Sequence, residues 1–338
     1  MTILDQAPRG TITRTFLETG AWQAGLRVRL PVVILRGPAD GPVLAVQAAQ
    51  HGREVAGIAA CYAAAESVDP ARLRGTLVLL PVMNPLAVRM RQQDFPYETG
   101  RYGNAVSANL NRHWNGTGNY PLLGEMASVV RAEVHDHADA LLDIHGWSAG
   151  TIGLAWTSRE HLELLVASGY PFLADVGPAA DQRNANFAGS AFRKTGRPGI
   201  TVELPTQNTF ESHHIQLGRR TILNLARKLG MLEESLELPY RQLLFDPSCE
   251  NRALAGEHEG MAVFDMARGE LVEPGTRLGR IVSLETLETL QELTAPVAGA
   301  IMYELRPPSE AVPMSSIVMP GDAVAEIRPV AREIVNAP

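Results

Sequence analysis

Two apolar segments of this chain lead directly into histidine, and this pattern constrains the fold more than any other. The run Val43-Leu-Ala-Val-Gln-Ala-Ala-Gln50 has the composition of a buried strand and is followed by His51. The run Ala140-Leu-Leu-Asp-Ile-His145 repeats the pattern further along the chain. An alanine-rich segment from Arg53 to about Glu66 follows the first run and predicts a helix. Open α/β sheets bind ligands at the carboxyl ends of their strands, so both histidines are expected at one such edge.

A carboxylate stands close to the first histidine, in His51-Gly-Arg-Glu54. Two histidines and one carboxylate make the open three-ligand set of hydrolytic zinc, which leaves a fourth position for water. The four-residue pattern is weak by itself, because it occurs by chance, but its place between a strand and a helix strengthens it. We therefore predict one Zn²⁺ per chain on His51, Glu54 and His145, with Glu54 in the first helical turn. Sites of this kind also accept manganese or cobalt.

The alternation of strands and helices continues as far as about residue 237. Expected strands lie at Thr76–Val82, Thr151–Trp156 and Gly199–Leu204, and expected helices near Leu122–His137, Arg159–Ser168 and Ser212–Leu229. The segment Leu26–Leu35 alternates like an edge strand, because Pro31 argues against a central position. This pattern predicts an α/β domain at residues 1–237, with a mixed, mainly parallel sheet covered by helices on both faces.

The remaining residues, 238–338, contain short β-like runs separated by Gly/Pro turns and predict a second, β-rich domain. Two of these runs, Glu273–Ile281 and Met319–Ile327, look like halves of a quasi-repeat, and the whole resembles a biotinyl/lipoyl-type β-sandwich. Such domains carry their prosthetic group on a lysine, and no lysine follows Lys228. A swinging-arm function is therefore excluded, and we expect the domain to cover or shape the active site.

Charge and cysteine content exclude several classes of function. The formal net charge of -7 argues against nucleic acid or an anionic membrane as a partner. The two cysteines, Cys61 and Cys249, make no disulfide framework, and Cys61 is expected to be a small core residue. No signal peptide is recognisable, and no apolar run approaches the roughly 18 residues of a membrane span. A cytoplasmic protein is expected, and a homo-oligomer is left open.

Glu203 is the candidate general base, because it ends a third apolar run, Gly199-Ile-Thr-Val-Glu203. A carboxylate in such a strand is costly without a partner. It is either a strand-edge glutamate paired with an arginine or a catalytic group at the same edge as the two histidines, and its position favours the second.

Other polar residues are candidates for substrate binding and for orienting the ligands. Asn111 and Arg112 suit recognition of a substrate carboxylate, although a surface loop held by asparagine turns is the commoner reading. Arg193 could reach the Glu203 pocket or lie in a solvated turn. Asp143 shares a strand face with His145 and is a candidate partner for that ring, or binds elsewhere. Trp147 either walls the pocket or belongs to the core.

The remaining histidines are interpreted as background. His135 and His137 lie near a helix end, where exposure is usual. His213 and His214 are adjacent and cannot easily face one metal.

Taken together, these residues resemble the succinylglutamate desuccinylase/aspartoacylase family, relatives of the zinc carboxypeptidases. The motifs that carry the resemblance are His51-Gly-Arg-Glu54, Asn84-Pro-Leu-Ala, Asn109-Leu-Asn-Arg112, Asp143-Ile-His145-Gly and Thr201-Val-Glu203. The likeness covers about residues 25–230, and the bacterial branch that acts on N-acetyl-diaminobutyrate is the most similar. It implies a zinc-carboxypeptidase-like fold in which Glu203 is the base, and Asn111, Arg112 and Arg193 bind substrate.

The resemblance is incomplete in the loop from Arg89 to Tyr120. Family members carry an arginine after the Asn-Pro motif that polarises the scissile carbonyl, and the equivalent offset here falls on Gln93. Arg91 and Arg101 are nearby, and Arg101 is the preferred catalytic counterpart. The segment after Arg112 is also changed, so the substrate is less certain than the metal site.

These observations predict a zinc-dependent amidohydrolase that removes the acyl group from a small N-acyl amino acid or a related carboxylate. A zinc carboxypeptidase acting on short peptides is the alternative enzyme. A non-catalytic binding protein on the same fold is the third reading and ranks last, because every metal ligand and the base are present.

Overall fold

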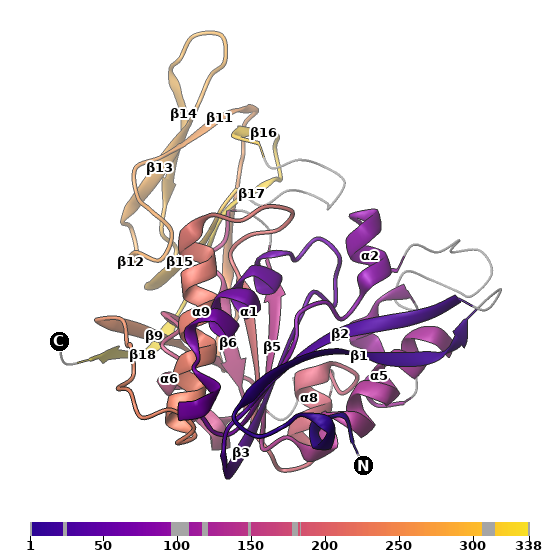
Figure 1. The fold of residues 1–338 in the computed structure, drawn as a ribbon. Helices are drawn as coiled ribbons and strands as arrows, with labels where there is room; N and C mark the ends of the chain where they lie inside the picture. Colours follow the sequence, from indigo (N-terminus) through magenta and orange to yellow (C-terminus); the bar gives the residue numbers. More distant parts are fainter. Residues whose placement is uncertain are drawn as a thin grey trace.

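A ten-stranded mixed sheet forms the body of the protein, and a small β-sandwich extends beyond one end of it (Figure 1). The computed structural model describes residues 2–22, 26–95, 108–116, 121–147, 150–177, 182, 184–305 and 315–336. In sheet order, the strands of the body are β1 (Thr11–Trp22), β2 (Leu26–Arg36), β4 (Arg74–Leu80), β3 (Ala39–Ala48), β5 (Ala140–Gly146), β8 (Gly199–Leu204), β6 (Leu154–Thr157), β7 (Phe172–Asp175), β9 (Arg241–Phe245) and β18 (Val330–Val335).

The centre of this sheet is parallel. Strands β4, β3, β5 and β8 are parallel neighbours, so the carboxyl ends of β3, β5 and β8 meet at one edge. Parallel pairing continues through β6, β7 and β9, whereas β6 runs antiparallel to β8. Antiparallel strands complete both sides, with β1 and β2 at one and β18 at the other. The predicted mixed, mainly parallel sheet is confirmed.

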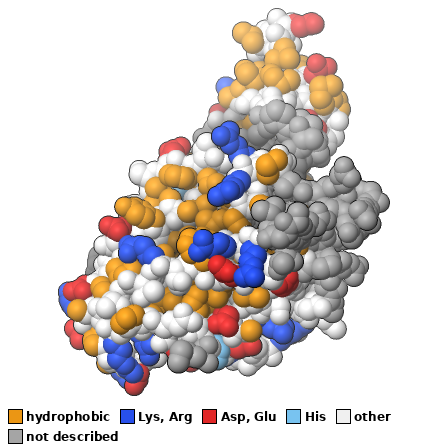
Figure 2. Space-filling view, turned by 45° about the vertical axis from the view of Figure 1, so that its right-hand side comes forward, with side chains coloured by type: hydrophobic (Ala, Val, Ile, Leu, Met, Phe, Trp, Pro, Cys, Tyr) orange, Lys and Arg blue, Asp and Glu red, His pale blue; other side chains and the backbone are white. Residues whose placement is uncertain are grey.

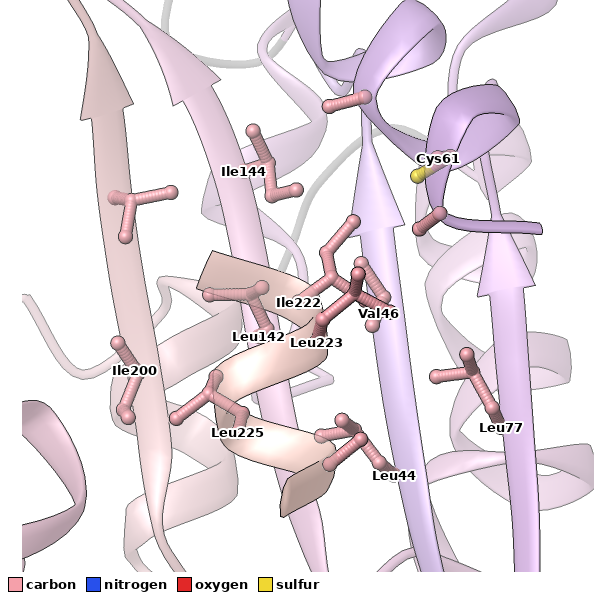
Figure 3. Close-up of a cluster of buried hydrophobic side chains, with 14 of the residues drawn as sticks. Leu44, Val46, Cys61, Leu77, Leu142, Ile144, Ile200, Ile222, Leu223 and Leu225 are labelled. Atoms are coloured by element: carbon pink, nitrogen blue, oxygen red, sulfur yellow. The ribbon is translucent and has the colours of Figure 1, made fainter. Parts of the chain in front are cut away.

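Helices cover both faces of the sheet, as expected. They are α1 (Ala56–Ser67), α2 (Pro85–Met90), α5 (Pro121–Glu133), α6 (Leu162–Ala167), α8 (Ala188–Arg193) and α9 (Ser212–Lys228), with 3-10 turns at Ile3–Gln6, Pro70–Arg72, Leu110–Arg112, His135–His137 and Arg159–His161. Helices α1 and α9 pack on one face, around side chains such as Leu142, Ile144 and Ile222 (Figure 3). Helices α5 and α8 pack on the other. Buried Cys61 belongs to the first core, as predicted.

Strand β2 differs from the prediction, because it is an interior strand. It lies between β1 and β4, and β1 is the edge. Pro31 is tolerated there because it faces Phe16 of β1, while β4 pairs only with the later residues Val33–Arg36. The missing N–H therefore falls where β2 has one pairing partner rather than two.

Glu54 also differs from the prediction, because it precedes the helix instead of lying within it. The amide N–H of Glu54 donates to the carbonyl of His51 (3.2 Å), which closes a turn, and α1 begins at Ala56. This turn brings the histidine and the carboxylate onto the same side of the chain.

The C-terminal part contains the expected β-sandwich. Two antiparallel four-stranded sheets enclose a separate hydrophobic core that includes Leu278, Ile301 and Ile327. One sheet has the order β10 (Arg252–Ala255), β17 (Ala323–Arg328), β15 (Gly299–Glu304) and β12 (Leu271–Val272); the other has β14 (Thr289–Thr294), β13 (Arg277–Val282), β11 (Gly260–Phe264) and β16 (Ile317–Val318). Exposed hydrophobic side chains gather on the sandwich (Figure 2), and Leu284, Leu287 and Leu290, in and next to the turn between β13 and β14, are exposed.

The two parts of the chain do not separate at residue 237. Strands β9 and β18 both come from the region 238–338, yet they complete the large sheet of the body. A hydrophobic cluster containing Leu154, Phe245 and Met302 further joins the sandwich to the sheet. The chain therefore leaves the body after β9, forms the sandwich and returns through β18, and a pattern of short β runs cannot distinguish those two strands from the sandwich strands.

Candidate metal centre and active site

Three side chains converge at the carboxyl edge of the parallel strands. His145 is the next-to-last residue of β5, and His51 follows the neighbouring parallel strand β3. Glu54 reaches between them from the turn before α1. Their ligand atoms all lie within 4.8 Å of one another, and all three side chains are buried. The structure therefore brings the predicted ligands together.

The two imidazoles present equivalent nitrogens to the carboxylate. His51 Nδ1 lies 2.7 Å from Glu54 Oε1, and His145 Nδ1 lies 2.9 Å from Glu54 Oε2. The ring centroids are 5.1 Å apart. Two nitrogens and a carboxylate that share one small region match the donor set that zinc takes in hydrolytic sites.

The outer nitrogens of both rings have their own acceptors. His51 Nε2 lies 3.1 Å from Asn109 Oδ1, and His145 Nε2 lies 3.1 Å from Asp143 Oδ2. A proton on each Nε2 can be donated to these oxygens, which leaves the Nδ1 lone pair for a metal ion. These partners orient both rings, so the residues present fit a divalent ion.

The electrostatic field at this site favours positive charge. Burial opposes ionisation, but His51 and His145 lower the pKa of Glu54 to about 2. The pKa of His145 is raised well above its usual value, because Asp143 and Glu54 outweigh the effect of burial. The field that attracts a proton to these rings also attracts a metal cation.

Glu203 lies beside His145 at the end of β8. The two residues are partners in the register of β5 and β8, so their side chains leave the same face of the sheet. No described residue forms a hydrogen bond with the Glu203 carboxyl, which keeps some access to solvent. Dense surrounding protein nevertheless raises its pKa to about 8 by burial, and the charge of Glu54 adds to this. A carboxyl poised near neutrality can both accept and return a proton.

Gly146 permits the close packing around Glu54. An ideal Cβ at this position would lie 2.5 Å from the carbonyl oxygen of Thr206 and 3.3 Å from Glu54 Cβ. Backbone atoms cannot yield as a flexible side chain can, so a residue larger than glycine would displace the segment that carries the ligands.

Asn111 lies beside the candidate ligand His145, and Arg112 follows it in the chain. Asn111 Nδ2 is 3.3 Å from His145 Nε2, and its Oδ1 accepts a hydrogen bond from the amide of Ala188 (2.9 Å). The half-buried guanidinium of Arg112 stacks over Phe187 at 4.0 Å. Burial lowers the pKa of Arg112, and the charge of Asp94 partly opposes this shift.

The candidate arginines do not all meet at the site. Arg193 Nη1 donates to the carbonyl of Gly199 (2.7 Å), at the amino end of β8. Four residues of strand, about 13 Å, separate that position from Glu203, so the structure does not bring the two together.

The described residues place no other candidate arginine at the centre. Arg101 lies outside the described residues. Arg91 is exposed and ends α2. Gln93 is the residue found near the centre, with Nε2 3.4 Å from Glu54 Oε1.

Sequence reasoning missed several polar residues that support the site. In the sequence, Asn109 is noticeable only as the first residue of the Asn109–Arg112 motif, whereas in the structure its side chain orients the ring of His51. Gln47 and Gln50 each donate to Asp143 Oδ1, at 2.9 and 2.7 Å. Trp114 Nε1 donates to Gln50 Oε1 (2.7 Å). The two glutamines could have been singled out from the sequence, because two side-chain amides in an apolar strand need buried hydrogen-bond partners.

The interpretation of His135 as an exposed helix-end residue was wrong. It is buried, its Nε2 lies 3.0 Å from Gln47 Oε1, and its ring stacks on Trp114. The helix ends at Glu133, and the following 3-10 turn directs His135 inward. His137, on the same turn, is exposed as expected.

Trp147 is half-buried and packs edge-on against Tyr303 of β15 at 5.5 Å.

Comparison with known families agrees with this geometry. Residues 40–229 match the model of the succinylglutamate desuccinylase/aspartoacylase catalytic domain. The chain belongs to this family. Its members are deacylating hydrolases that cleave amide bonds, and this chain is a hydrolase of that kind. The matched residues include all three candidate ligands and Glu203.

Solved structures share the fold over nearly the whole chain. The ectoine utilization protein EutE from Ruegeria pomeroyi, in a product-bound form, is 20% identical, with a TM-score of 0.72 over 96% of this chain and 98% of that one. A family member from Rhodobacter sphaeroides is 19% identical, with a TM-score of 0.71 over 95% and 97%. A succinylglutamate desuccinylase from Silicibacter sp. TM1040 is 19% identical, with a TM-score of 0.73 over 96% and 97%.

A search of curated proteins returned no match. Among the described residues, no helix has both the length and the apolar character that crossing a membrane requires.

Proposed function

We propose that this protein is a zinc-dependent deacylase that hydrolyses the amide bond of a small N-acyl amino acid. The observation that carries the proposal is the placement of Glu203 beside a buried His51–Glu54–His145 cluster at one sheet edge. The cluster matches a zinc donor set, and the neighbouring carboxyl has a pKa of about 8. Family membership supports amide hydrolysis as the reaction.

His51, Glu54 and His145 would hold the ion, with both imidazoles bound through Nδ1. When bound, zinc supplies a Lewis acid that makes water acidic near neutral pH and polarises a carbonyl. Asn109 and Asp143 keep the two rings in the tautomer that this requires.

Glu203 would move the proton during hydrolysis. Its carboxylate takes a proton from the attacking water as oxygen bonds to the amide carbon. It then delivers that proton to the nitrogen as the carbon–nitrogen bond breaks, so that the products are a carboxylic acid and an amine. A pKa near neutrality suits both steps, because a strongly acidic carboxyl would not accept the proton.

Asn111 and Arg112 would bind the carboxylate of the substrate. The Arg112 guanidinium donates to the carbonyl of Asn111 through Nη1 and stacks on Phe187, which fixes the plane of its fork. A guanidinium held in this way can bind a carboxylate through two parallel hydrogen bonds. We propose Gln93 as a further amide donor near Glu54, at the position where family members carry an arginine.

The β-sandwich would shape the cleft on the side of β5. Tyr303 of the sandwich contacts Trp147, two residues beyond His145, and bridges to Thr151 of the body. A wall at this place would limit the length of the substrate, which favours a small acyl amino acid over a peptide chain.

A substrate panel with metal analysis tests the proposal. Freshly purified protein should contain about one zinc per chain, measured by plasma mass spectrometry. It should hydrolyse N-acetyl and N-succinyl amino acids, with N-acetyl-diaminobutyrate included, faster than dipeptides of similar size. A preference for dipeptides would instead identify a carboxypeptidase. Protein without bound metal, and inactive after zinc is added, would refute the proposal.

A further inference from the structure

A second pocket lies on the α5/α8 side of the sheet, behind the buried ring of His135. Its volume is about 390 Å³, within the usual range for small-molecule sites. The 3-10 turn after α5, the end of α8 and the segment after Arg112 surround it. Its principal side chains are Trp114, Arg131, His135, Phe192, Lys194 and Arg197.

Positive charge is concentrated in this pocket, although the whole chain has a net charge of -7. Arg131, Lys194 and Arg197 line it, and Asp136 is the one acidic residue among its lining residues. In the described part of the chain, no carboxylate forms an ion pair with any of these three cations. One of only two lysines in the sequence lies here. Three cations therefore line one small cavity, and no ion pair with a described carboxylate neutralises their charge.

The guanidinium of Arg197 is already fixed in position. Its Nε donates to Thr195 Oγ1 (2.8 Å), and its Nη1 donates to backbone carbonyls, including that of His135 (3.0 Å). Its plane also lies over the ring of Phe192, 4.6 Å from the centroid. Nη2 has no hydrogen bond to a described residue. This guanidinium lines the pocket and would therefore lose little further side-chain freedom on binding an anion.

The inner wall of the pocket is also preformed. Trp114 donates to Gln50, and His135 contacts Gln47, and both glutamines are buried and donate to Asp143. Burial first, and then the charges of Arg197 and Arg131, lower the pKa of His135 to about 4. Both arginines therefore project positive potential into the pocket.

We propose that this pocket is a second ligand site, separate from the candidate metal centre, and that it binds a small oxyanion carrying two or more negative charges. Guanidinium and ammonium groups bind phosphate and carboxylate through charge-assisted hydrogen bonds, and both classes share this chemistry. The cavity is large enough for a phosphate monoester or a dicarboxylate. Apart from Asp136, the charged side chains that line it are cationic, and the rings of Trp114, His135 and Phe192 are buried, so little aromatic surface is available to a large apolar ligand.

Isothermal titration calorimetry with inorganic phosphate, and separately with malonate, tests this proposal. At low ionic strength the protein should bind at least one of them with a Kd of about 1 mM or tighter. Binding of phosphate alone identifies a phosphate site, and binding of malonate, alone or with phosphate, identifies a carboxylate-accepting site. The double variant Arg131→Gln/Lys194→Gln should bind the anion about tenfold or more weakly, because it loses two charge-assisted contacts.

A matched control separates this site from general surface charge. The double variant Arg14→Gln/Lys228→Gln also removes one arginine and one lysine, from positions away from the pocket. It should bind the anion within about twofold of the wild-type protein. Absence of binding by the wild type would overturn the proposal. Equal affinity of wild type and Arg131→Gln/Lys194→Gln would also overturn it, because the anion would then be held elsewhere, for example at the metal centre.

Discussion

His145 and Glu203 occupy paired positions on the neighbouring parallel strands β5 and β8. Their side chains leave the same face of the sheet, so a candidate metal ligand and a carboxyl without a described hydrogen-bond partner are held next to each other by backbone hydrogen bonds rather than by a loop. Rigid strands fix such a pair within the narrow tolerance that proton transfer needs. This relationship is the basis of the proposed deacylase chemistry.

Replacing Glu203 by glutamine should abolish most turnover without removing the metal. The amide has nearly the same shape, but it cannot accept a proton, so kcat should fall about 10²- to 10⁴-fold. Steady-state kinetics and metal content measured on the same sample check this. Glu66→Gln removes an exposed carboxyl from α1 and should behave as wild type. Near-wild-type activity in Glu203→Gln would mean that another group is the base.

Asn109→Ala should weaken metal binding about 10- to 100-fold, because His51 loses the acceptor that orients its ring. Competition with a chromophoric chelator measures this affinity. Asn109→Asp retains an oxygen at the same place and should recover much of the loss. If alanine and aspartate variants bound metal equally well, the side-chain oxygen would have no orienting role.

His135 should make the protein sensitive to acid. Its pKa is about 4 in the folded protein, against about 6.5 when unfolded, because burial and the charges of Arg197 and Arg131 outweigh Asp143. The unfolded chain therefore takes up a proton first as the pH falls, and folding stability is lost between about pH 6.5 and pH 4. The whole loss is about 3 kcal/mol for this 2.5-unit difference.

Urea denaturation at pH 7 and pH 4.5 tests the role of His135. The fall in unfolding free energy between these two values should be smaller in His135→Gln than in wild type. His137→Gln replaces an exposed histidine on the same turn and should retain the wild-type fall. An unchanged fall in His135→Gln would show that other groups cause the acid sensitivity.

Gly146→Ala should both destabilise the protein and impair its metal site. The added methyl group would meet the Thr206 carbonyl oxygen at 2.5 Å and press on Glu54, at a cost of about 1–3 kcal/mol. Gly124→Ala in α5 is the control, because no atom lies within 4 Å of its ideal Cβ. There, alanine should stabilise the helix by roughly 0.5–1 kcal/mol. Thermal unfolding and zinc content distinguish the two variants.

The parts of the fold that sequence patterns predicted well are those with strong local signals. The strand Gly199–Leu204 was predicted with its observed bounds, and the strand around Val43–Gln50 and the helix after it were found within a few residues. Continuous apolar runs bounded by turn residues identify buried strands, because only such strands need both faces apolar. The same reasoning failed for Pro31, since the extent of pairing with β4 depends on strands far away in the sequence.

The candidate site was predictable because strand ends carry positional information. Histidine at the ends of two parallel strands, and Glu203 at the end of a third, must share an edge once the strands are parallel neighbours. No comparable strand-end pattern indicated the position of Arg193. A ten-residue offset from Glu203 does not determine where a helical side chain lies, and the structure places its guanidinium near the start of β8.

The sequence alone therefore determined the strand–helix alternation, the three candidate ligand residues and the carboxyl beside them, because these depend on local periodicity and on residue type. Only the tertiary structure decided the order of the strands, the return of β18 to the main sheet and the inward direction of His135. It also decided that Asn109 contacts the ring of His51 and that the buried glutamines donate to Asp143 beside His145. Each of these depends on contacts between distant segments, whose free energy is set by packing and hydrogen bonding in the folded chain and leaves no local pattern.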